Sequence, residues 1–481
     1  MAISFGVDLG AGVLLKEERC DMKLLRHIVI LLIMLLVSAC GAQQTPTTTG
    51  GSSPSPSPSQ ASTSPSPSPT SGSTSGGSNT GQVVHLRLMT WLDASGKALM
   101  DQAIKEFEQQ HPNIQITQET VAGTGAATYP DVLKTGMAGG NPPDLFFMWG
   151  GSLAAPFIDA DQVIRMEPYY KKYNWDKILI SHAVQAIKRK GALYGVPIHY
   201  QGMGFWYRKD IFQKYGLKPP KTYQELEQIC ETLKQHNIAC LSMGGKYGWN
   251  VMRLLDYFIE MEAGPEKHDQ LDKLEASWDD PAVVNAYKLL NKWAKNGWIP
   301  EGFMAVTPDD ARIPWFQGKA AMVFEGGWII PVIKQQGQDI TKYGFIVPPT
   351  GHNPERISAF PEQFMIAKAS KHPDEAAEFI NWFIQPSVQE KYYDISGSTA
   401  TANVKLDPKK YPLVNEWNKV VATHEAYPPT DQAFYKELMD SYFRVQDAII
   451  DGRMTPEQGA KEMQKAAEDW KRRNPGKCGM C

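Results

Sequence analysis

The chain has 481 residues, more than a single compact hydrophobic core usually organises, so we expect two or more lobes in its folded part. Hydrophobic residues make up 42% and aromatic residues 10% of the chain, which excludes a wholly disordered or fibrous protein. Its 49 basic and 52 acidic side chains give a net charge of −3. This balance predicts neither nucleic-acid binding nor a broad membrane-binding surface.

The first forty residues have the pattern of an export signal. A basic stretch precedes an apolar run over 28–37, and the run ends in Val37-Ser38-Ala39-Cys40. A transmembrane helix needs about 20 apolar residues, so this shorter run predicts a cleaved signal peptide. The four residues ending at Cys40 are similar to a bacterial lipobox, which implies that Cys40 carries a lipid. We assign 1–39 to leader and signal peptide, with no separate function for 1–21.

Residues 40–81 are expected to form a tether behind the lipidated cysteine. Of the 41 residues from 41 to 81, 35 are Ser, Thr, Pro or Gly, types that cannot bury a hydrophobic face. A flexible coil of this length separates its ends by roughly 35 Å, and polyproline geometry extends it further. Export signal, lipid and tether together predict an extracytoplasmic protein that contacts the cell membrane through its lipid anchor alone.

Beyond residue 82, strand patterns alternate with helix patterns. Alternating apolar residues predict a first strand over 83–91, and apolar residues at three- and four-residue spacing predict a helix around 99–107. Further strands are expected over 114–119, 144–149, 193–200, 205–208, 239–243, 320–325 and 343–347, and further helices over 222–235, 281–296, 373–384, 431–450 and 456–473. The alternation predicts an α/β protein with mixed, mostly parallel sheets and covering helices. No flexible linker follows residue 82, so we expect the chain to cross repeatedly between lobes.

Motifs of nucleotide-binding and hydrolytic enzymes are missing from the sequence. It contains no GxxxxGK[ST], HExxH or GxSxG motif, and Gly123-Thr124-Gly125 lacks the third glycine of a dinucleotide fingerprint. The ten histidines are scattered singly, without the spacing of metal ligands. We therefore expect no enzyme activity, no cofactor and no metal site.

Four cysteines remain when Cys20 and Cys40 are set aside with the leader. Cys230 and Cys240 lie on an adjacent predicted helix and strand, where a disulfide would contribute about 2 to 3 kcal/mol; two buried thiols are the alternative. Cys478 and Cys481 have CxxC spacing at the end of the chain, and there a terminal disulfide and free thiols both remain open.

Several tryptophans fall at predicted strand ends, beside glycines and polar residues. Ligands of open α/β sheets bind beyond the carboxyl ends of the strands, so these side chains are expected to face a cleft. Indole rings stack on the C–H faces of a sugar while carboxylates and amides bind its hydroxyls, which makes a carbohydrate the expected ligand. The candidates from this pattern are Trp91, Asp93, Trp149, Trp249, Glu325 and Trp328, whereas Trp293, Trp382 and Trp470 lie in helical patterns and are expected in the core.

The order of several short segments resembles the extracellular solute-binding proteins of the sugar ABC transporter type, family 1. The segments are 86–91, 139–145, 193–197, 206–210, 325–328 and 455–458, and the resemblance extends over 83–473. It implies a two-lobed periplasmic-binding-protein-like clamshell of type II, with the ligand between the lobes and a membrane permease as partner. It also implies that lobe 1 comprises 83–200 and 362–402, that lobe 2 comprises 201–361 and 403–475, and that 476–481 form a tail.

The resemblance also assigns places to the candidate ligand residues. Trp91, Asp93 and Trp149 correspond to strand-end loops of lobe 1, and Trp249 and Trp328 to stacking aromatics of lobe 2. Further candidates are Tyr200 and Gln201 on the hinge side, Glu325, and Glu362. A Gly-Gly pair common before the last hinge strand is replaced here by residues 360–363, so specificity is expected to differ on that wall.

The resulting hypothesis is a monomeric substrate-binding component of an ABC importer. It captures a mono- or oligosaccharide by lobe closure and delivers it to the transmembrane subunits of the permease. Three alternatives remain: a receptor for a non-sugar solute, an anchored carbohydrate-active enzyme, and a surface adhesin or structural lipoprotein.

Overall fold

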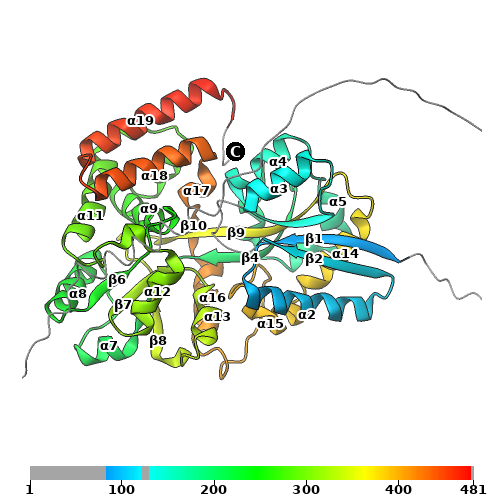
Figure 1. Cartoon of the computed structure of the whole chain (residues 1–481), viewed down its shortest axis with the longest axis horizontal. Helices are drawn as coiled ribbons and strands as arrows, with labels where there is room; N and C mark the ends of the chain where they lie inside the picture. Colours follow the sequence, from blue (N-terminus) through cyan, green and yellow to red (C-terminus); the bar gives the residue numbers. More distant parts are fainter. Residues whose placement is uncertain (1–82, 122–128, 478–481) are drawn as a thin grey trace, which may run out of the picture. The chain divides into compact units, whose positions relative to one another are not determined.

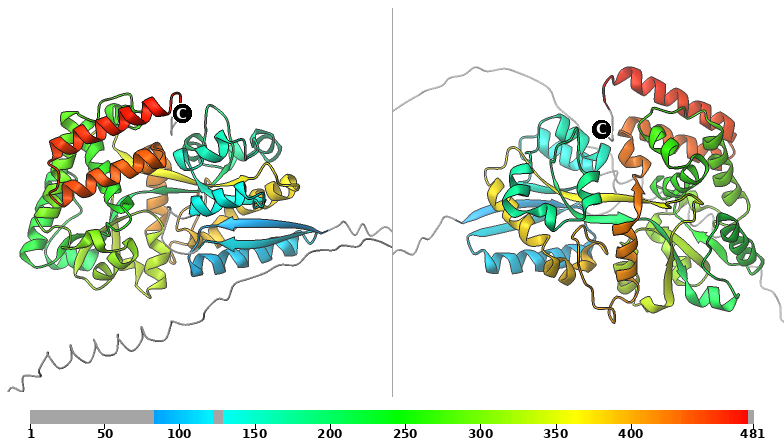
Figure 2. Two further views of the ribbon diagram at one scale, coloured as in Figure 1. Left: turned by 45° about the horizontal axis from the view of Figure 1, so that its top comes forward. Right: turned by 180° about the vertical axis from the view of Figure 1, so that it is seen from behind.

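The computed structural model describes residues 83–121 and 129–477. The expected signal peptide, Cys40, the tether, and the Cys478 and Cys481 pair lie outside these residues. Figures 1 and 2 show the described part of the chain as two groups of strands with helices packed around each. None of the helices in this part is long and apolar enough to cross a membrane.

The first sheet has six strands. They are β1 (Val84–Thr90), β2 (Ile114–Thr120), β3 (Leu145–Trp149), β4 (Val196–Gly202), β9 (Arg356–Ile366) and β10 (Glu425–Tyr427). The order is β10-β9-β3-β1-β2, and β4 pairs with β9. β1 runs parallel to β2 and β3, and β9 runs antiparallel to β3 and β4. All five residues of β3 are buried, as expected of a strand covered on both faces.

The second sheet has four strands, in the order β6-β7-β5-β8. They are β5 (Gly204–Arg208), β6 (Ala239–Ser242), β7 (Ala320–Glu325) and β8 (Tyr343–Ile346). β6 is parallel to β7, whereas β5 is antiparallel to both β7 and β8. Only Met203 separates β4 from β5, so the chain passes directly from the first sheet into the second. Figure 1 shows β4 and β9 lying side by side where the two sheets meet.

Helices cover both sheets. Around the first sheet lie α2 (Ala94–Gln110), α3 (Tyr129–Ala138), α4 (Ala155–Asp159), α5 (Glu167–Tyr173), α6 (Ser181–Ala186), α14 (Pro373–Phe383) and α15 (Pro386–Lys391). With the second sheet lie α7 (Lys209–Lys214), α8 (Tyr223–Gln235), α9 (Trp249–Ala263), α10 (Pro265–Asp272), α11 (Pro281–Lys295), α12 (Pro308–Phe316), α13 (Ile329–Gln335), α18 (Lys436–Ile450) and α19 (Pro456–Arg473). In Figures 1 and 2, α18 and α19 pack side by side next to α11. The short helices α16 (Val414–Thr423) and α17 (Thr430–Ala433) lie between the two groups.

All eight expected strands are present, with ends shifted by a few residues. The apolar pattern predicted neither β9 nor β10, and residues 360–363, expected to precede a last hinge strand, lie within β9. β9 was missed because its sequence interrupts the apolar pattern with Arg356, Pro361 and Glu362, although all eleven residues are buried. Because β9 runs against its neighbours, the described sheets contain four parallel and four antiparallel pairings. The sheets are therefore mixed, with a smaller parallel share than expected.

The single helix expected over 431–450 is wrong. Phe434 and Tyr435 have extended backbone and separate α17 from α18. The break has a tertiary cause, because the Phe434 ring packs 5.6 Å from Trp278 and the Tyr435 hydroxyl donates to Asp159 at 2.9 Å. These contacts hold the two residues out of a continuous helix.

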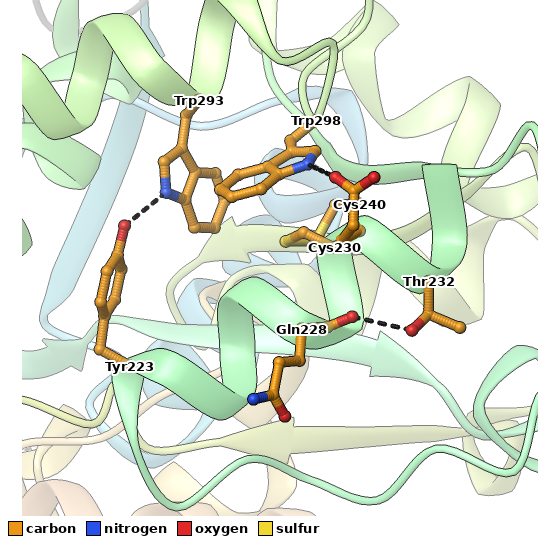
Figure 3. Close-up of a disulfide and its surroundings, with 8 residues drawn as sticks. Tyr223, Gln228, Cys230, Thr232, Cys240, Trp293 and Trp298 are labelled. Atoms are coloured by element: carbon orange, nitrogen blue, oxygen red, sulfur yellow. Dashed lines mark hydrogen bonds between the residues drawn. A yellow bond between two sulfur atoms is a disulfide. The ribbon is translucent and has the colours of Figure 1, made fainter. Parts of the chain in front are cut away.

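A disulfide between Cys230 and Cys240 joins α8 to β6, with the two Cα atoms 4.8 Å apart (Figure 3). Both cysteines are buried. Figure 3 shows the rings of Trp293 and Trp298 above this bridge, and the Trp293 indole donates to the Tyr223 hydroxyl at 3.0 Å. The bridge is thus part of the core of the second group of elements.

Most of the tryptophans belong to the core. Trp293, Trp382 and Trp470 are buried, as expected from their helical patterns. Fully buried rings also come from outside those patterns: Trp175, Trp206, Trp278, Trp315 and Trp417. Most tryptophans of the described part of the chain therefore pack in the core, and the strand-end rings remain as candidates for contact with a ligand.

Candidate functional site

The first pair of indole rings lies at the carboxyl ends of β1 and β3. Trp91 follows β1 directly and Trp149 is the last residue of β3. These strands are parallel neighbours, so their carboxyl ends meet at one edge of the sheet, and the two ring centroids are 5.3 Å apart. Trp149 is buried against Phe147 and Tyr129, whereas Trp91 is half-buried. Of this pair, Trp91 has the more accessible ring.

The second pair of indole rings lies at the corresponding ends of β6 and β7. Trp249 begins α9 a few residues after β6, and Trp328 follows β7. β6 and β7 are also parallel, and the ring centroids of Trp249 and Trp328 are 6.2 Å apart. Both rings are half-buried. The same strand-end geometry thus occurs independently in both sheets.

Glu325 is buried beside Trp328, and protein groups bind both of its carboxylate oxygens. Its carboxylate is buried and forms an ion pair with Arg312, with Arg312 Nε 3.0 Å from Glu325 Oε1. The other oxygen accepts a 2.6 Å hydrogen bond from the Trp328 indole. Both carboxylate oxygens are therefore occupied by protein groups, and one of them fixes the orientation of the Trp328 ring.

Tyr200 packs in a hydrophobic cluster on the face of β4 opposite to Gln201, and the reason is the alternation of side chains along β4. Successive residues of a strand point to opposite faces, so Tyr200 and Gln201 cannot both face the same space. Tyr200 packs in the hydrophobic cluster that contains Ile357 and Trp417, and burial raises the pKa of its hydroxyl. Only Gln201 takes part in the polar contacts described next.

A buried polar network joins β4, β9 and the segment after α15. Gln201 Nε2 donates to Ser396 Oγ at 2.7 Å, and Ser396 Oγ donates to Glu362 Oε2 at 3.2 Å. His199 Nδ1 lies 3.0 Å from the same Glu362 oxygen. Within residues 83–121 and 129–477, Gln201 Oε1 has no hydrogen-bond partner. Gln201 therefore has one buried acceptor that the described residues leave unpaired, while Glu362 holds the network together.

Asp93 is exposed and caps a helix. Its Oδ1 accepts a 2.6 Å hydrogen bond from the Gly96 backbone at the start of α2. An N-cap aspartate of this kind stabilises the helix by about 1 kcal/mol. Asp93 thus has a structural role at the start of α2, two residues after Trp91 in the sequence.

A short part of β9 lies between the two indole pairs. Glu362 is the register partner of Trp149, and the Phe360 ring is 6.0 Å from Trp328. Two residues of β9 that are two positions apart thus neighbour Trp149 of the first sheet and Trp328 beside the second. β9 therefore neighbours one residue of each indole pair: Trp149, which is buried, and Trp328, which is half-buried.

Three residues of this region were missed from the sequence. Phe360 forms part of the aromatic wall, and the Arg253 guanidinium lies 4.6 Å above its ring. Arg253 also pairs with Asp431, with Arg253 Nη2 3.3 Å from Asp431 Oδ2. One signal could have identified Arg253, because it is the only basic residue in the otherwise largely apolar stretch 251–259.

Comparison with known proteins places the chain in a family. Residues 91–390 match the family model of the bacterial extracellular solute-binding proteins. An uncharacterized ABC transporter extracellular-binding protein of Pyrococcus horikoshii is 28% identical over 392 residues, covering 80% of this chain and 83% of that protein. The multiple sugar-binding protein of Streptococcus mutans is 25% identical over 327 residues, covering 66% of this chain and 75% of that protein.

Solved structures with similar folds support the architecture. A chitin oligosaccharide binding protein has a TM-score of 0.73 at 22% identity, covering 81% of this chain and 99% of that protein. A structure from a study of xylan utilization by Caldanaerobius polysaccharolyticus has a TM-score of 0.73 at 24% identity, covering 79% of this chain and 99% of that one. The fold is the type II periplasmic-binding-protein-like fold, as expected from the sequence.

Proposed function

Because the chain belongs to the bacterial extracellular solute-binding proteins, we propose that it binds a mono- or oligosaccharide and delivers it to the permease of an ABC importer. One observation carries the carbohydrate assignment: each sheet brings two indole rings together at its strand ends, and β9 neighbours one residue of each pair, Trp149 and Trp328. Aromatic faces at strand ends suit the apolar faces of pyranose rings.

The polar groups beside these rings are of the kind that bind sugar hydroxyls. The network around Gln201 offers an unoccupied amide oxygen, and Trp328 is held rigidly by Glu325. A preorganised aromatic ring loses little conformational entropy when a ligand stacks on it. The sugar-binding relatives named above support the same ligand class.

The two lobes are proposed to follow the boundaries expected from the sequence, 83–200 with 362–402 and 201–361 with 403–475. The direct passage from β4 to β5 across Met203 supports a first crossing between them. The continuous strand β9, which contains the boundary at 361–362, supports a second one. Bound sugar would then stabilise the closed arrangement, because only that arrangement offers it contacts from both lobes.

The family is extracellular, and we infer that this member is held at the membrane by a lipid on Cys40 and acts as a monomer. The lipobox-like sequence and the tether after it support this attachment. The lipid would keep the receptor close to the permease while the tether leaves its folded part free to collect solute. We propose no catalysis, which the match to a family of solute-binding proteins supports.

Isothermal titration of the purified protein with a panel of mono- and oligosaccharides tests the proposal. We expect at least one sugar to bind and Trp249→Ala or Trp328→Ala to weaken it about tenfold or more, which corresponds to about 1.4 kcal/mol. The control is Trp328→Phe, which keeps an aromatic face and should retain most of the affinity. If no carbohydrate binds while a polyamine, peptide or metal complex does, the protein is a receptor for another solute class.

A further inference from the structure

One face of α9 carries a row of polar side chains that begins at the second indole pair. Trp249, Arg253, Asp256 and Glu260 are spaced four, three and four residues apart and therefore lie along the same side of the helix. Arg253, Asp256 and Glu260 are almost completely buried. Buried charges are normally fully paired and hydrogen-bonded, so the partners of each one are informative.

Asp256 and Glu260 have the expected partners. Asp256 accepts hydrogen bonds from the Thr430 hydroxyl at 2.6 Å and from the Tyr442 hydroxyl at 3.0 Å. Glu260 forms an ion pair with Arg356 at 2.8 Å. These two carboxylates link α9 to β9, α17 and α18. Neither has a buried oxygen without a hydrogen-bond partner among the described residues.

Arg253 differs from its two neighbours. Its side chain is 5% exposed, and its pairing with Asp431 uses only Nη2. Nε and Nη1 of Arg253 lack a hydrogen-bond partner in the described part of the chain, and so does Oδ1 of Asp431. An unpaired buried polar group is unfavourable, because it has lost its hydrogen bonds to water without replacing them. Two donor atoms of Arg253 and one acceptor atom of Asp431 are therefore available to a hydrogen-bond partner that is not among the described residues.

The location of this pair is beside the candidate site. The guanidinium of Arg253 stacks over Phe360, which neighbours Trp328, and Arg253 lies one helical turn after Trp249. Asp431 lies on α17, and its backbone carbonyl accepts a 3.0 Å hydrogen bond from Ser152, three residues after Trp149. The Arg253–Asp431 pair thus lies next to the second indole pair and is linked to the loop after the first.

The charges of the pair restrict its ligand. A carboxylate that approached the Arg253 donors would also meet the negative Oδ1 of Asp431, and an ammonium group that approached Asp431 would meet the positive guanidinium. Two adjacent hydroxyls fit both, because one accepts from Arg253 while its neighbour donates to Asp431. Pyranose rings carry such pairs on one edge while their C–H faces contact an aromatic ring.

We propose that Arg253 and Asp431 are ligand-binding residues that select an uncharged sugar unit with two adjacent hydroxyls over an acidic or an amino sugar. This inference rests on the proposed function, because it assumes that a saccharide lies against Trp249 and Trp328. It adds a class of sugar to that function and assigns the selection to one ion pair.

The test is a calorimetric comparison of wild-type protein with Arg253→Met and Asp431→Asn, using the tightest neutral sugar of the panel, its uronic acid and amino sugar analogues, and its deoxy derivatives. We expect each substitution to weaken binding of the neutral sugar 10- to 100-fold. We expect the wild type to bind the charged analogues at least tenfold more weakly than the neutral sugar. Removing one of the adjacent hydroxyls should cost the wild type more affinity than it costs Asp431→Asn.

Controls separate the possible failures. Arg253→Lys keeps the positive charge and disturbs the packing less than Arg253→Met does. Arg87→Met removes the ion pair between Arg87 of β1 and Glu119 of β2 without affecting the site. Binding at wild-type affinity by the folded Arg253 and Asp431 variants would overturn the inference while leaving the proposed function intact. Preference of the wild type for a charged analogue would overturn it too. Absence of any sugar binding by the wild type would instead refute the proposed function.

Discussion

Replacing Asp272 by asparagine should stabilise the protein at neutral pH and have little effect in acid. Asp272 is the last residue of α10 and is 4% exposed. Among the described residues, neither of its carboxylate oxygens has a hydrogen-bond partner. Burial disfavours the charged form and raises the pKa of Asp272 from 3.8 to about 7, although the nearby His268 acts in the opposite direction.

The sign of the pH dependence of stability follows from the fact that the Asp272 carboxyl loses its proton at a lower pH in the unfolded chain than in the folded one. Well below pH 4 the carboxyl is protonated in both states and has no effect on the free energy of unfolding. Between about pH 4 and pH 7 only the unfolded chain ionises, so stability falls as the pH rises. The difference of about 3 between the two pKa values corresponds to about 4 kcal/mol, reached above pH 7.

Urea unfolding of wild type and Asp272→Asn from pH 4 to pH 8 measures this effect. Asparagine cannot ionise. The free energy of unfolding of the variant should therefore rise steadily relative to that of the wild type between pH 4 and pH 7, by up to about 4 kcal/mol. A constant offset from the unpaired amide would not change this slope. Asp440→Asn, at an exposed position of α18, is the matched control and should show no such gain. A difference between Asp272→Asn and wild type that is the same at pH 4 and pH 8 would refute the reasoning.

Two further predictions concern stability alone. Replacing Cys230 and Cys240 by alanine should lower the free energy of unfolding by about 3 kcal/mol, because the bridge closes a loop with a sequence separation of 10; urea unfolding of this variant checks it, and a loss well under 1 kcal/mol would contradict it. Gly151→Ala should destabilise more than Gly140→Ala in thermal unfolding. Both glycines have positive φ, but a Cβ at Gly151 would lie 2.1 Å from the Gln432 carbonyl oxygen, whereas none of the described atoms lies within 4 Å of a Cβ at Gly140. Equal losses would show that α17 moves aside without cost.

The strands that could be predicted are those whose apolar pattern is local. β7 was predicted with its observed bounds because all its residues except Glu325 are apolar. β9 could not be recognised in the same way, since its buried Arg356 and Glu362 are paired with Glu260 and His199, which are far away in the sequence. Because β9 was not predicted from its apolar pattern, its neighbourhood with Trp149 and Trp328 was not predicted either.

The sequence by itself determined the α/β class, the strand-end positions of Trp91, Trp149, Trp249 and Trp328, and the resemblance that implies a sugar receptor. These features depend on residue type and short-range spacing, which are visible along the chain. The tertiary structure alone decided which polar groups near those rings are occupied. Glu325 is bound by Arg312. The ion pair that keeps unpaired donors and an unpaired acceptor joins Arg253 to Asp431, 178 residues further along the chain. Burial and hydrogen-bond pairing depend on contacts between distant segments, and no local pattern records them.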